Sequence, residues 1–336
     1  MEAARPAYSH SEGFAERHWY RLSLLSLVLF PASLVFCVVV ALRRSLYRAG
    51  VLRSVRLPVP VIVVGNLTVG GTGKTPLVLW LAEALRRRGM HPGIVSRGFG
   101  RGSNGLRQVR AGDDAKQVGD EPLLLAERSK CPVWIGADRA LAARALLAAN
   151  PHCDVVLCDD GLQHYGLARD FEIAVEDGRG MGNGLLLPAG PLREPAGRPV
   201  DATVVNDDRS KPGTFRMRLK PAGFFRVDSN GGAVPQSELA GKRLHAVAGI
   251  GNPLRFFSEL TRLGLQFAAH AFPDHHAFEP SDLEFPACDL VLMTEKDAVK
   301  CRRFGRHDLV VMRVEAEPDP ALAELIVERI NGRAPA

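Results

Sequence analysis

The spacing of hydrophobic and polar positions predicts a chain of alternating strands and helices. Short runs rich in Val and Ile, typical of buried parallel strands, lie at residues 59–64, 92–96, 132–135 and 154–158. Stretches with apolar residues three and four positions apart predict helices between them, at 76–88, 121–129 and 138–149. This alternation is typical of a doubly wound α/β sheet, in which ligand loops follow the carboxyl ends of the strands.

The pattern weakens over residues 206–240, which are rich in Gly, Pro, Asn and Ser, so we interpret this stretch as a linker with a hairpin. A second α/β unit is predicted after it, with strands at 244–248 and 290–293 and helices at 253–263 and near 319–331. The expected domains are an N-terminal segment, a core, the linker and a smaller C-terminal unit, at 1–45, 46–205, 206–240 and 241–336.

Residues 22–42 form an apolar run of 21 residues without a charge. As a helix the run would extend ~31 Å, about one bilayer core, and Pro31 would kink it. The alternatives are a buried helix of a soluble body and a kinked segment that dips into one leaflet. A cleaved signal peptide is disfavoured because Arg43 and Arg44 follow the run where small residues belong. The arginines on this side orient the body toward the cytoplasm by the positive-inside rule.

Charge is distributed unevenly along the chain, whose net charge is +6. Residues 43–110 carry +12, whereas residues 111–336 carry −6. The basic stretch abuts the apolar run and has little aromatic interleaving, which favours anionic membrane lipids as partners and argues against nucleic acid. The six cysteines are scattered without paired spacing, which argues against a zinc site or a disulfide framework and fits a reducing compartment.

A glycine-rich loop, GNLTVGGTGKTP, follows the first predicted strand and precedes the first helix. This order is typical of a phosphate-binding loop, whose backbone N–H groups bind phosphate oxygens. In such a loop Lys74 would reach the β- and γ-phosphates, and the Thr75 hydroxyl would bind Mg²⁺. The strict motif has glycine where this chain has Thr68. The predicted nucleotide-binding residues are Thr68, Val69, Gly70, Gly71, Thr72, Gly73, Lys74 and Thr75.

The strand at 154–158 ends in Asp159 and Asp160. Acids at this position are typical of the partner motif that holds Mg²⁺, directly or through water. The alternative is a strand that ends in a turn with a solvated acid. Loop, acids and alternation together predict a P-loop NTPase-like doubly wound sheet, with an N-terminal membrane helix and a second, smaller α/β domain.

Eight segments occur in order over residues 61–300: VVGNLTVGGTGKTP, IVSRGFGRG, GDEPLLLA, DDGLQHYGLARDFEI, GNGLLLPAGPLREP, AVAGIGNP, FPDHHAF and LMTEKDAVK. In this order they closely resemble the tetraacyldisaccharide 4′-kinase family of the lipid A pathway. The resemblance extends over the apolar segment and implies a bacterial inner-membrane enzyme that faces the cytoplasm. It would transfer the γ-phosphate of ATP, with Mg²⁺, to the 4′-hydroxyl of an acylated glucosamine disaccharide 1-phosphate. The sequence points to no protein partner.

A rival hypothesis is a membrane-anchored regulatory P-loop NTPase. Such a protein would use phosphate-loop hydrolysis to drive a partner and would release phosphate without modifying a lipid. A kinase would move labelled γ-phosphate onto the disaccharide acceptor, which distinguishes the two hypotheses.

The resemblance makes Asp120 the general base and His275 the histidine that pairs with it. From the residues alone, a helix N-cap and a polar turn are the alternatives. The neighbouring His276 leaves open which histidine acts, although the family pattern favours His275. Because Asp120 and His275 lie on different predicted units, we expect a site in the cleft between them, assembled by closure.

Further roles follow from the same resemblance. Arg193 and Glu194 would face the nucleotide phosphates and the metal, with a surface ion pair as the alternative. The catalytic set is Asp120, His275, Lys74 and Arg193, and the metal ligands are Thr75, Asp159, Asp160 and Glu194. Gln163 and His164 are candidates for nucleotide or substrate contacts. Arg97 and Arg101 are candidates for the substrate 1-phosphate or lipid headgroups, with a solvated basic loop as the alternative.

The segment Thr294-Glu295-Lys296-Asp297 follows a predicted strand and superficially resembles the NKxD motif that reads guanine. Its lysine is displaced by one position and the asparagine is missing, so GTP specificity does not follow. A structural interpretation, in which Thr294 caps the next helix, is equally well supported, and the role of the segment stays open.

Overall fold

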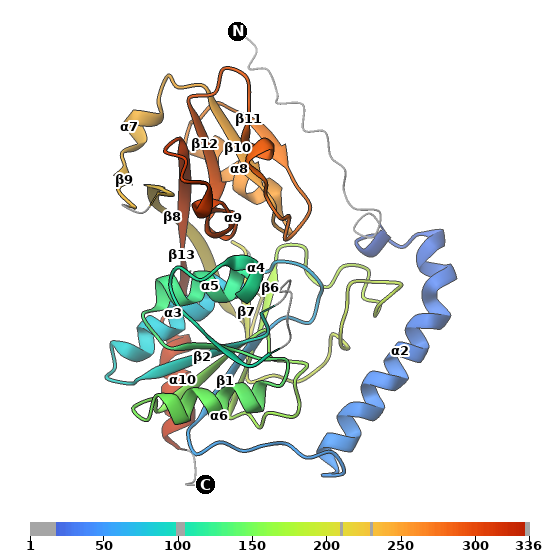
Figure 1. Cartoon of the computed structure of the whole chain (residues 1–336). Helices are drawn as coiled ribbons and strands as arrows, with labels where there is room; N and C mark the ends of the chain where they lie inside the picture. Colours follow the sequence, from blue (N-terminus) through green and yellow to red (C-terminus); the bar gives the residue numbers. More distant parts are fainter. Residues whose placement is uncertain (1–17, 99–104, 209–210, 229–230, 333–336) are drawn as a thin grey trace.

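The computed structural model describes residues 18–98, 105–208, 211–228 and 231–332. It has a larger and a smaller lobe, with a long helix beside the larger one (Figure 1). The helices are α2 (Leu24–Arg48), α3 (Lys74–Arg86), α4 (Ala115–Val118), α5 (Asp120–Ser129), α6 (Arg139–Ala149), α7 (Gln236–Leu239), α8 (Pro253–Arg262), α9 (Glu295–Cys301) and α10 (Ala321–Asn331). Two short 3₁₀ turns are η1 (Pro280–Leu283) and η2 (Arg302–Phe304).

The strands of the larger lobe are β1 (Val61–Gly65), β2 (Pro92–Ser96), β3 (Arg107–Val109), β4 (Val133–Ile135), β5 (Val155–Asp159), β6 (Phe171–Asp177) and β7 (Ala202–Asn206). Those of the smaller lobe are β9 (Ala233–Val234), β10 (Leu244–Ala248), β11 (Phe267–Ala271) and β12 (Leu290–Thr294). Two longer strands, β8 (Phe215–Arg226) and β13 (Leu309–Pro318), connect the lobes.

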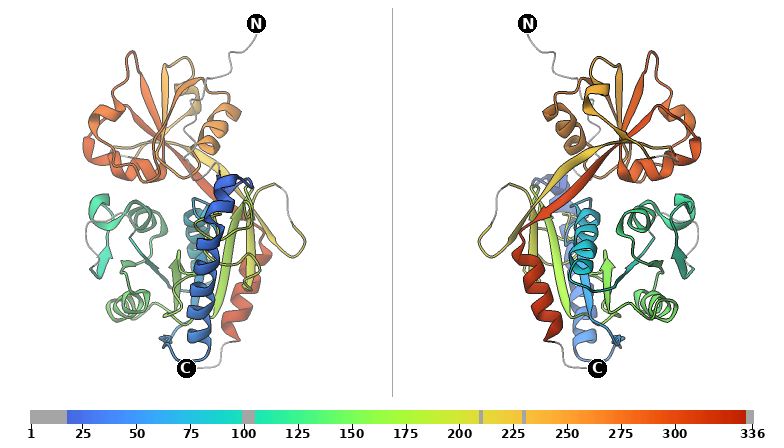
Figure 2. Two further views of the ribbon diagram at one scale, coloured as in Figure 1. Left: turned by 90° about the vertical axis from the view of Figure 1, so that its right-hand side faces the viewer. Right: turned by 90° about the vertical axis from the view of Figure 1, so that its left-hand side faces the viewer.

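One sheet runs through both lobes, in the order β11-β10-β12-β13-β8-β7-β6-β1-β5-β2-β4-β3, with β9 paired to β8. Neighbours are parallel within each lobe, except that edge strand β3 runs antiparallel to β4 and the short β9 runs antiparallel to β8. At the centre, β8 and β13 pair antiparallel, with a register shift between Arg313 and Val314. Figure 2 shows these two strands passing from one lobe to the other. They are therefore the covalent hinge between the lobes.

The larger lobe buries apolar side chains on both faces of its sheet. Strand β1 is buried along its whole length, which explains why its sequence is continuously apolar instead of alternating. On one face α3 contributes Leu77, Leu81 and Leu85 to the core. On the other face α6 contributes Ala143 and Leu146. This packing fixes β1 and α3 relative to each other, so the loop between them has a rigid base.

Two elements differ from the sequence prediction. Residues 206–240 were predicted to be a linker with a hairpin, but they contain the 12-residue strand β8 as well as the β8–β9 pairing. Helix α10 was predicted within the C-terminal unit, yet Leu322, Ile326 and Ile330 pack into the core of the larger lobe. The chain therefore returns to the larger lobe through β13, and its last helix does not belong to the smaller one.

Helix α2 exposes an apolar side and docks a polar one. Its large exposed apolar residues are Leu24, Leu27, Val28, Phe30, Leu34, Val35, Val38, Val39 and Leu42. Ser26 and Ser33 are buried on the side that contacts the loop between β6 and β7. The alternative of a buried core helix is therefore wrong, and the exposed apolar side is consistent with membrane anchoring. Within the described residues, α2 alone has the length and composition to cross a membrane.

Candidate active site

The phosphate-binding loop predicted from the sequence connects β1 to α3. Gly73 adopts a left-handed conformation (φ 94°) immediately before the helix begins. The Asn206 amide at the end of β7 donates to the Thr72 carbonyl over 3.0 Å, and the Arg179 guanidinium donates to the Gly71 carbonyl over 3.2 Å. These two side chains, which the sequence analysis did not single out, hold the loop from outside. The first N–H groups of α3 then face the space where phosphates bind.

A short antiparallel bridge brings Arg193 beside the loop. The Arg193 N–H donates to the Leu67 carbonyl over 2.7 Å, and the Val69 N–H donates to the Pro191 carbonyl over 2.9 Å. The alternative for Arg193, a surface ion pair, is not favoured, because the segment at 191–193 runs along the phosphate loop.

Asp160 forms ion pairs with two basic side chains, Lys74 and Arg193. Lys74 Nζ lies 3.5 Å from one carboxylate oxygen of Asp160 and donates to the Asn66 amide oxygen over 3.2 Å. Arg193 Nη1 lies 3.3 Å from both carboxylate oxygens of Asp160. Burial opposes ionisation of Asp160, but Lys74 and Arg193 outweigh it and lower its pKa to about 2. In this state Lys74 and Arg193 are both paired with the Asp160 carboxylate.

Asp159 is fully buried at the end of β5, between Asp160 and Ser96. One carboxylate oxygen accepts from the Ser96 hydroxyl over 3.1 Å, and the other has no hydrogen-bond partner. Burial, followed by the nearby Glu121 and Asp160 charges, raises the pKa of Asp159 to about 7. A cation at this oxygen would compensate the burial and lower that pKa. The unpartnered oxygen of Asp159 therefore fits a divalent metal.

The donor set as a whole also suits Mg²⁺. Thr75, in the first turn of α3, lines the interlobe pocket close to Lys74. The described residues contain no group of three or more His, Cys, Asp or Glu side chains placed to enclose a metal. Mg²⁺ typically takes one or two carboxylates together with substrate phosphates and water, so an incomplete protein cage is expected.

Glu194 lies in a separate buried network. Its Oε2 lies 2.7 Å from Arg198 Nε and accepts from the Tyr165 hydroxyl over 2.5 Å. Its Oε1 is buried without a hydrogen-bond partner. Arg198 already neutralises much of the Glu194 charge, and Oε1 is the atom left for a metal or a water ligand.

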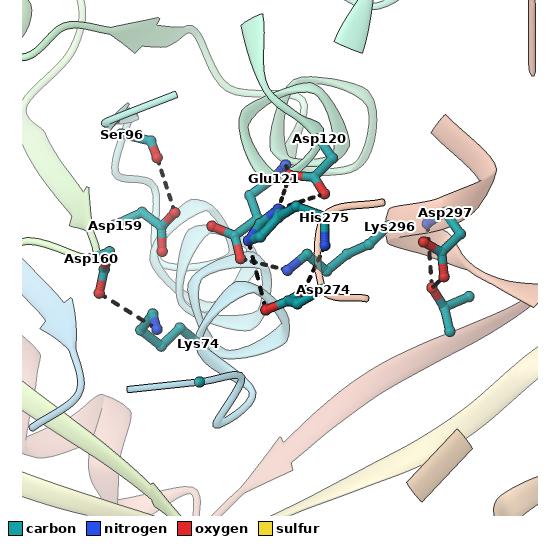
Figure 3. A network of polar contacts seen from close by, with 12 residues as sticks. Lys74, Ser96, Asp120, Glu121, Asp159, Asp160, Asp274, His275, Lys296 and Asp297 are labelled. Atoms are coloured by element: carbon teal, nitrogen blue, oxygen red, sulfur yellow. Dashed lines mark hydrogen bonds and ion pairs between the residues drawn. The ribbon is translucent and has the colours of Figure 1, made fainter. Parts of the chain in front are cut away.

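Asp120 and His275 meet across the lobes (Figure 3). His275 Nδ1 lies 3.0 Å and 3.2 Å from the two carboxylate oxygens of Asp120, whose side chain is 7% exposed. The neighbouring His276 pairs with Asp282 over 2.9 Å instead. Of the two neighbouring histidines, His275 is therefore the one that contacts Asp120.

The pair is electrostatically biased toward its charged form. Burial would raise the pKa of Asp120, but His275, Lys296 and Lys300 outweigh it and lower the value to about 2. The hydrogen bond that His275 donates to Asp120 raises the pKa of His275 above its ordinary value, against the effect of burial. Asp120 is also the first residue of α5, and its side chain accepts from the Glu121 N–H over 2.8 Å. The helix-terminus role and the histidine contact therefore coexist.

The remaining predicted residues surround the site less closely. The Gln163 amide donates to the Asn66 carbonyl over 3.3 Å, which ties it to the phosphate-loop region. Burial, then the cations Arg139 and Arg97, lower the pKa of His164 to about 4, so this histidine is neutral. Arg97 is exposed after β2. Arg101 lies outside the described residues.

A pocket opens between the lobes above the phosphate loop. The larger lobe lines it with Lys74, Thr75 and Glu121, and the smaller lobe with Arg255 and Lys296. Its apolar wall consists of Leu79, Leu124, Leu219, Ile250, Phe256, Met312 and Val314. The cationic floor suits the charged phosphates of a nucleotide, and the apolar wall suits its base. The fold and site together define a phosphate-loop enzyme of the phosphoryl-transfer class.

Comparison with known proteins narrows this class. The model of the family described as tetraacyldisaccharide-1-P 4′-kinase matches residues 25–331. The tetraacyldisaccharide 4′-kinase of Methylobacillus flagellatus is 50% identical over 94% of this chain and 95% of its own length. That of Azoarcus sp. is 50% identical over the full length of both chains. The chain belongs to the tetraacyldisaccharide 4′-kinase family.

A solved structure supports the fold. The crystal structure of LpxK from Aquifex aeolicus in complex with ATP has a TM-score of 0.78 and 30% identity to this chain. The similarity covers 91% of this chain and 100% of that one. The family resemblance, the α/β fold class and the ATP-dependent kinase class predicted from the sequence are thereby confirmed. The roles of single residues stay predictions.

Proposed function

We propose that the chain transfers the γ-phosphate of ATP to the 4′-hydroxyl of tetraacyldisaccharide 1-phosphate, a step of lipid A biosynthesis, in the cleft between its lobes. The observation that carries the proposal is the contact between Asp120 and His275, which come from opposite lobes. Glu121, the neighbour of Asp120, lines the same pocket as Lys74 and Thr75. An acceptor hydroxyl beside Asp120 would thus lie close to phosphates bound by the loop.

The phosphate loop, residues 68–75, would hold the nucleotide through its backbone N–H groups and the start of α3. Lys74 and Arg193 would move from Asp160 to the transferring phosphate, where negative charge spreads over the equatorial oxygens. Thr75, Asp159, Asp160 and Glu194 are the proposed ligands of Mg²⁺, directly or through water. When bound, the ion would neutralise charge on the β- and γ-phosphates.

Asp120 would accept the proton of the 4′-hydroxyl. Its pKa of about 2 keeps it ionised at neutral pH, so it is in the form that a base requires. His275 would orient the carboxylate through Nδ1 and stabilise its charge. A positioned base contributes about 10²–10⁴-fold to a rate, and we assign a share of this size to Asp120.

The acceptor side of the site is proposed from the sequence candidates. Arg97 is exposed after β2, and with Arg101 it would meet the 1-phosphate of the disaccharide or a lipid headgroup. Gln163 and the neutral His164 follow Asp160 closely in the chain and would contact nucleotide or sugar by hydrogen bonds.

The membrane role is proposed for α2, with the catalytic body on the cytoplasmic side of the bacterial inner membrane. Both ends of the helix contact the same body. The Trp19 indole, just before α2, donates to the Pro188 carbonyl over 3.0 Å, and the Tyr47 ring lies 5.7 Å from the Tyr165 ring. A helix held at both ends by one body lies along the membrane surface instead of crossing it, with its apolar side among the lipids. The sequence left open whether this helix spans the membrane or dips into it, and the contacts at both of its ends favour the in-plane arrangement proposed here.

The test is a transfer assay with γ-labelled ATP and detergent-solubilised tetraacyldisaccharide 1-phosphate. The wild-type chain should place the label on the lipid, whereas a regulatory NTPase would release only phosphate. Lys74→Ala should abolish transfer, because the mobile cation for the γ-phosphate is lost, while thermal unfolding stays close to wild type. Normal transfer by a folded Lys74→Ala variant would contradict the proposal.

A further inference from the structure

The segment Thr294–Asp297 lines the interlobe pocket through Thr294, Glu295 and Lys296, but it has no part in the proton transfer described above, although it lies beside the proposed base. It joins the end of β12 to the start of α9 in the smaller lobe. Figure 3 shows Lys296 extending from this segment toward Glu121 and Asp274, next to the Asp120–His275 pair. Lys296 is therefore placed where it can influence how Asp120 and His275 are arranged.

Helices α9 and α5 belong to different lobes and are joined by ion pairs. Lys296 Nζ lies 2.7 Å from Glu121 Oε1 at the N-terminal end of α5. Farther along α5, Arg128 pairs with Glu295, and Glu127 pairs with Arg302 of η2. Lys296 thus holds the end of α5 where Asp120 lies, and the other two pairs hold the opposite end.

The start of α9 is fixed to the loop that carries His275. The Thr294 hydroxyl donates to Asp297 Oδ2 over 2.7 Å, and the same oxygen accepts from the Gly249 N–H over 3.0 Å. The carbonyl of Gly249 in turn accepts from the His275 N–H over 3.2 Å. One residue, Gly249, therefore connects the first turn of α9 with the backbone of His275. Lys296 and His275 keep a fixed relative position as a result.

The charge of Lys296 is secured by three carboxylates. Burial would lower the pKa of its ammonium, but Glu121, Asp120 and Asp274 raise it above the ordinary value. Lys296 is therefore a permanent cation at any pH at which the enzyme works. Its charge acts on both members of the pair, since it favours the ionised form of Asp120 and disfavours the charged form of His275.

We propose that Lys296 is a positioning residue for phosphoryl transfer. Through Glu121 it holds the start of α5 against the smaller lobe, so that Asp120 meets His275. The inference rests on the proposed role of Asp120 as base and extends it. It also assigns a function to a motif whose resemblance to a guanine-reading sequence is accidental.

Other charged groups face the Asp120–His275 pair and would still act on its pKa values in a variant without Lys296. Lys300 of α9 lies 4.0 Å from Asp120, and Asp274 lies 3.8 Å from His275 Nε2. The adjoining pocket on the far side of Asp120 is lined by the charged residues Asp114, Lys116, Lys300 and Arg303. Without Lys296, the charges of Glu121 and Asp274 lose their nearest cation. Both Asp120 and His275 should then bind protons at higher pH.

The experiment compares Lys296→Met and Lys296→Arg with the wild-type enzyme in the labelled-ATP assay across pH. Lys296→Met should lower kcat about tenfold or more, because the position of α5 and the pKa of Asp120 are affected; the KM for ATP is measured alongside, since Lys296 also lines the interlobe pocket. The acidic limb of its kcat/KM profile should move to higher pH, because Lys296 lowers the pKa of Asp120. Lys296→Arg, which keeps the charge, should restore most of the rate and the wild-type limb.

Arg302→Met is the matched control, because it also breaks an ion pair between the smaller lobe and α5 but lies away from Asp120. It should leave both kcat and the acidic limb unchanged. A Lys296→Met variant with a wild-type pH limb, or an Arg302→Met variant with the same losses, would overturn the proposal. If Lys296→Met fails to fold in a thermal scan, Lys296→Gln, with its polar end group, serves for the same comparison.

A separate measurement distinguishes this inference from the base assignment. If Asp120 is the base and Lys296 acts through it, Asp120→Asn/Lys296→Met should be no slower than Asp120→Asn alone. A wild-type rate for Asp120→Asn would refute the base, whatever Lys296 does. A slow Asp120→Asn with further, additive loss in the double variant would refute only the role of Lys296.

Discussion

His275 Nδ1 lies 3.0 Å from Oδ2 of Asp120, although the two residues are 155 positions apart and belong to opposite lobes. The contact requires β8 and β13 to hold the lobes at their present angle, because these strands are the hinge. A change in that angle would separate the histidine from the carboxylate without altering either lobe. Assembly of the proposed base is therefore coupled to closure of the cleft.

Replacement of Asp120 by Asn should lower kcat about 10²–10⁴-fold, because the amide cannot accept the hydroxyl proton. The dissociation constant for ATP should change little, since Asp120 makes no contact with the phosphate loop. Turnover in the labelled-ATP assay and nucleotide titration measure the two effects. Asp113→Asn is the control, as Asp113 pairs with Arg107 and accepts from the Arg110 N–H, away from Asp120. Equal rates for Asp120→Asn and wild type would remove Asp120 as the base.

The Asp120–His275 pair should make the free energy of unfolding depend on pH. The folded pKa of His275 is raised, so its contribution is complete below its unfolded value of about 6.5 and is lost as the pH rises through the folded value. Asp120, at about 2, loses its contribution only as the pH falls through that value. His275→Gln should therefore lower Tm most in mildly acidic buffer and least in alkaline buffer.

Thermal scans at several pH values check this dependence. His307→Gln is the control, because His307 is exposed and only loosely paired with Asp228, 3.6 Å away. A Tm difference for His275→Gln that grows toward alkaline pH would contradict the sign of the proposed linkage.

Elements with local signals could be predicted from the sequence. Strand β1 and helix α3 were found because a continuously apolar run, a glycine loop and a helical spacing follow one another. Strand β8 could not be predicted in this way, because its residues are mostly half-exposed and include Pro221 and Gly223. Its sequence therefore shows neither alternation nor a continuous apolar run. It is a strand only because β13, some ninety residues later, pairs with it. The packing of α10 on the larger lobe is non-local in the same way.

The candidate site divides along similar lines. Lys74, Thr75 and Asp159 lie in motifs that can be read from neighbouring residues, and the Asp120–His275 pair came from the family resemblance. The contact of Asn206 with the phosphate loop and that of Lys296 with Glu121 depend on the arrangement of distant elements. No residue spacing in the sequence predicts these two contacts.

The left-handed conformation of Gly73 gives a test of the phosphate loop. A Cβ at this position would lie 2.5 Å from the Asn206 amide nitrogen, and the φ of 94° is costly for any other residue. Gly73→Ala should reduce the free energy of unfolding by about 1–3 kcal/mol, with loss of ATP binding. Gly71→Ala is the matched control for stability, because its Cβ would meet no atom within 4 Å. Urea unfolding that ranks Gly71→Ala below Gly73→Ala would contradict this assignment.

Ser33 connects the membrane helix to the loop that leads to Arg193. Its hydroxyl donates to the Leu186 carbonyl over 2.8 Å and accepts from the Ala189 N–H over 2.9 Å. Ser33→Val replaces the hydroxyl by a methyl group and adds a second one, so it leaves both backbone groups without this partner, at a cost of about 1–3 kcal/mol. The loop should then dock less firmly and kcat should fall several-fold, while partitioning into anionic vesicles stays unchanged.

The opposite behaviour is expected on the exposed side of α2. Val35→Asp introduces a charge among the apolar residues that face away from the body, so partitioning into vesicles should weaken while turnover in detergent stays at the wild-type value. Sedimentation with vesicles and the transfer assay measure the two effects. The two faces of α2 would then have separate functions, one binding lipid and the other holding the active-site loop. If Ser33→Val and Val35→Asp instead lose partitioning and turnover together, α2 does not lie between body and membrane in this way.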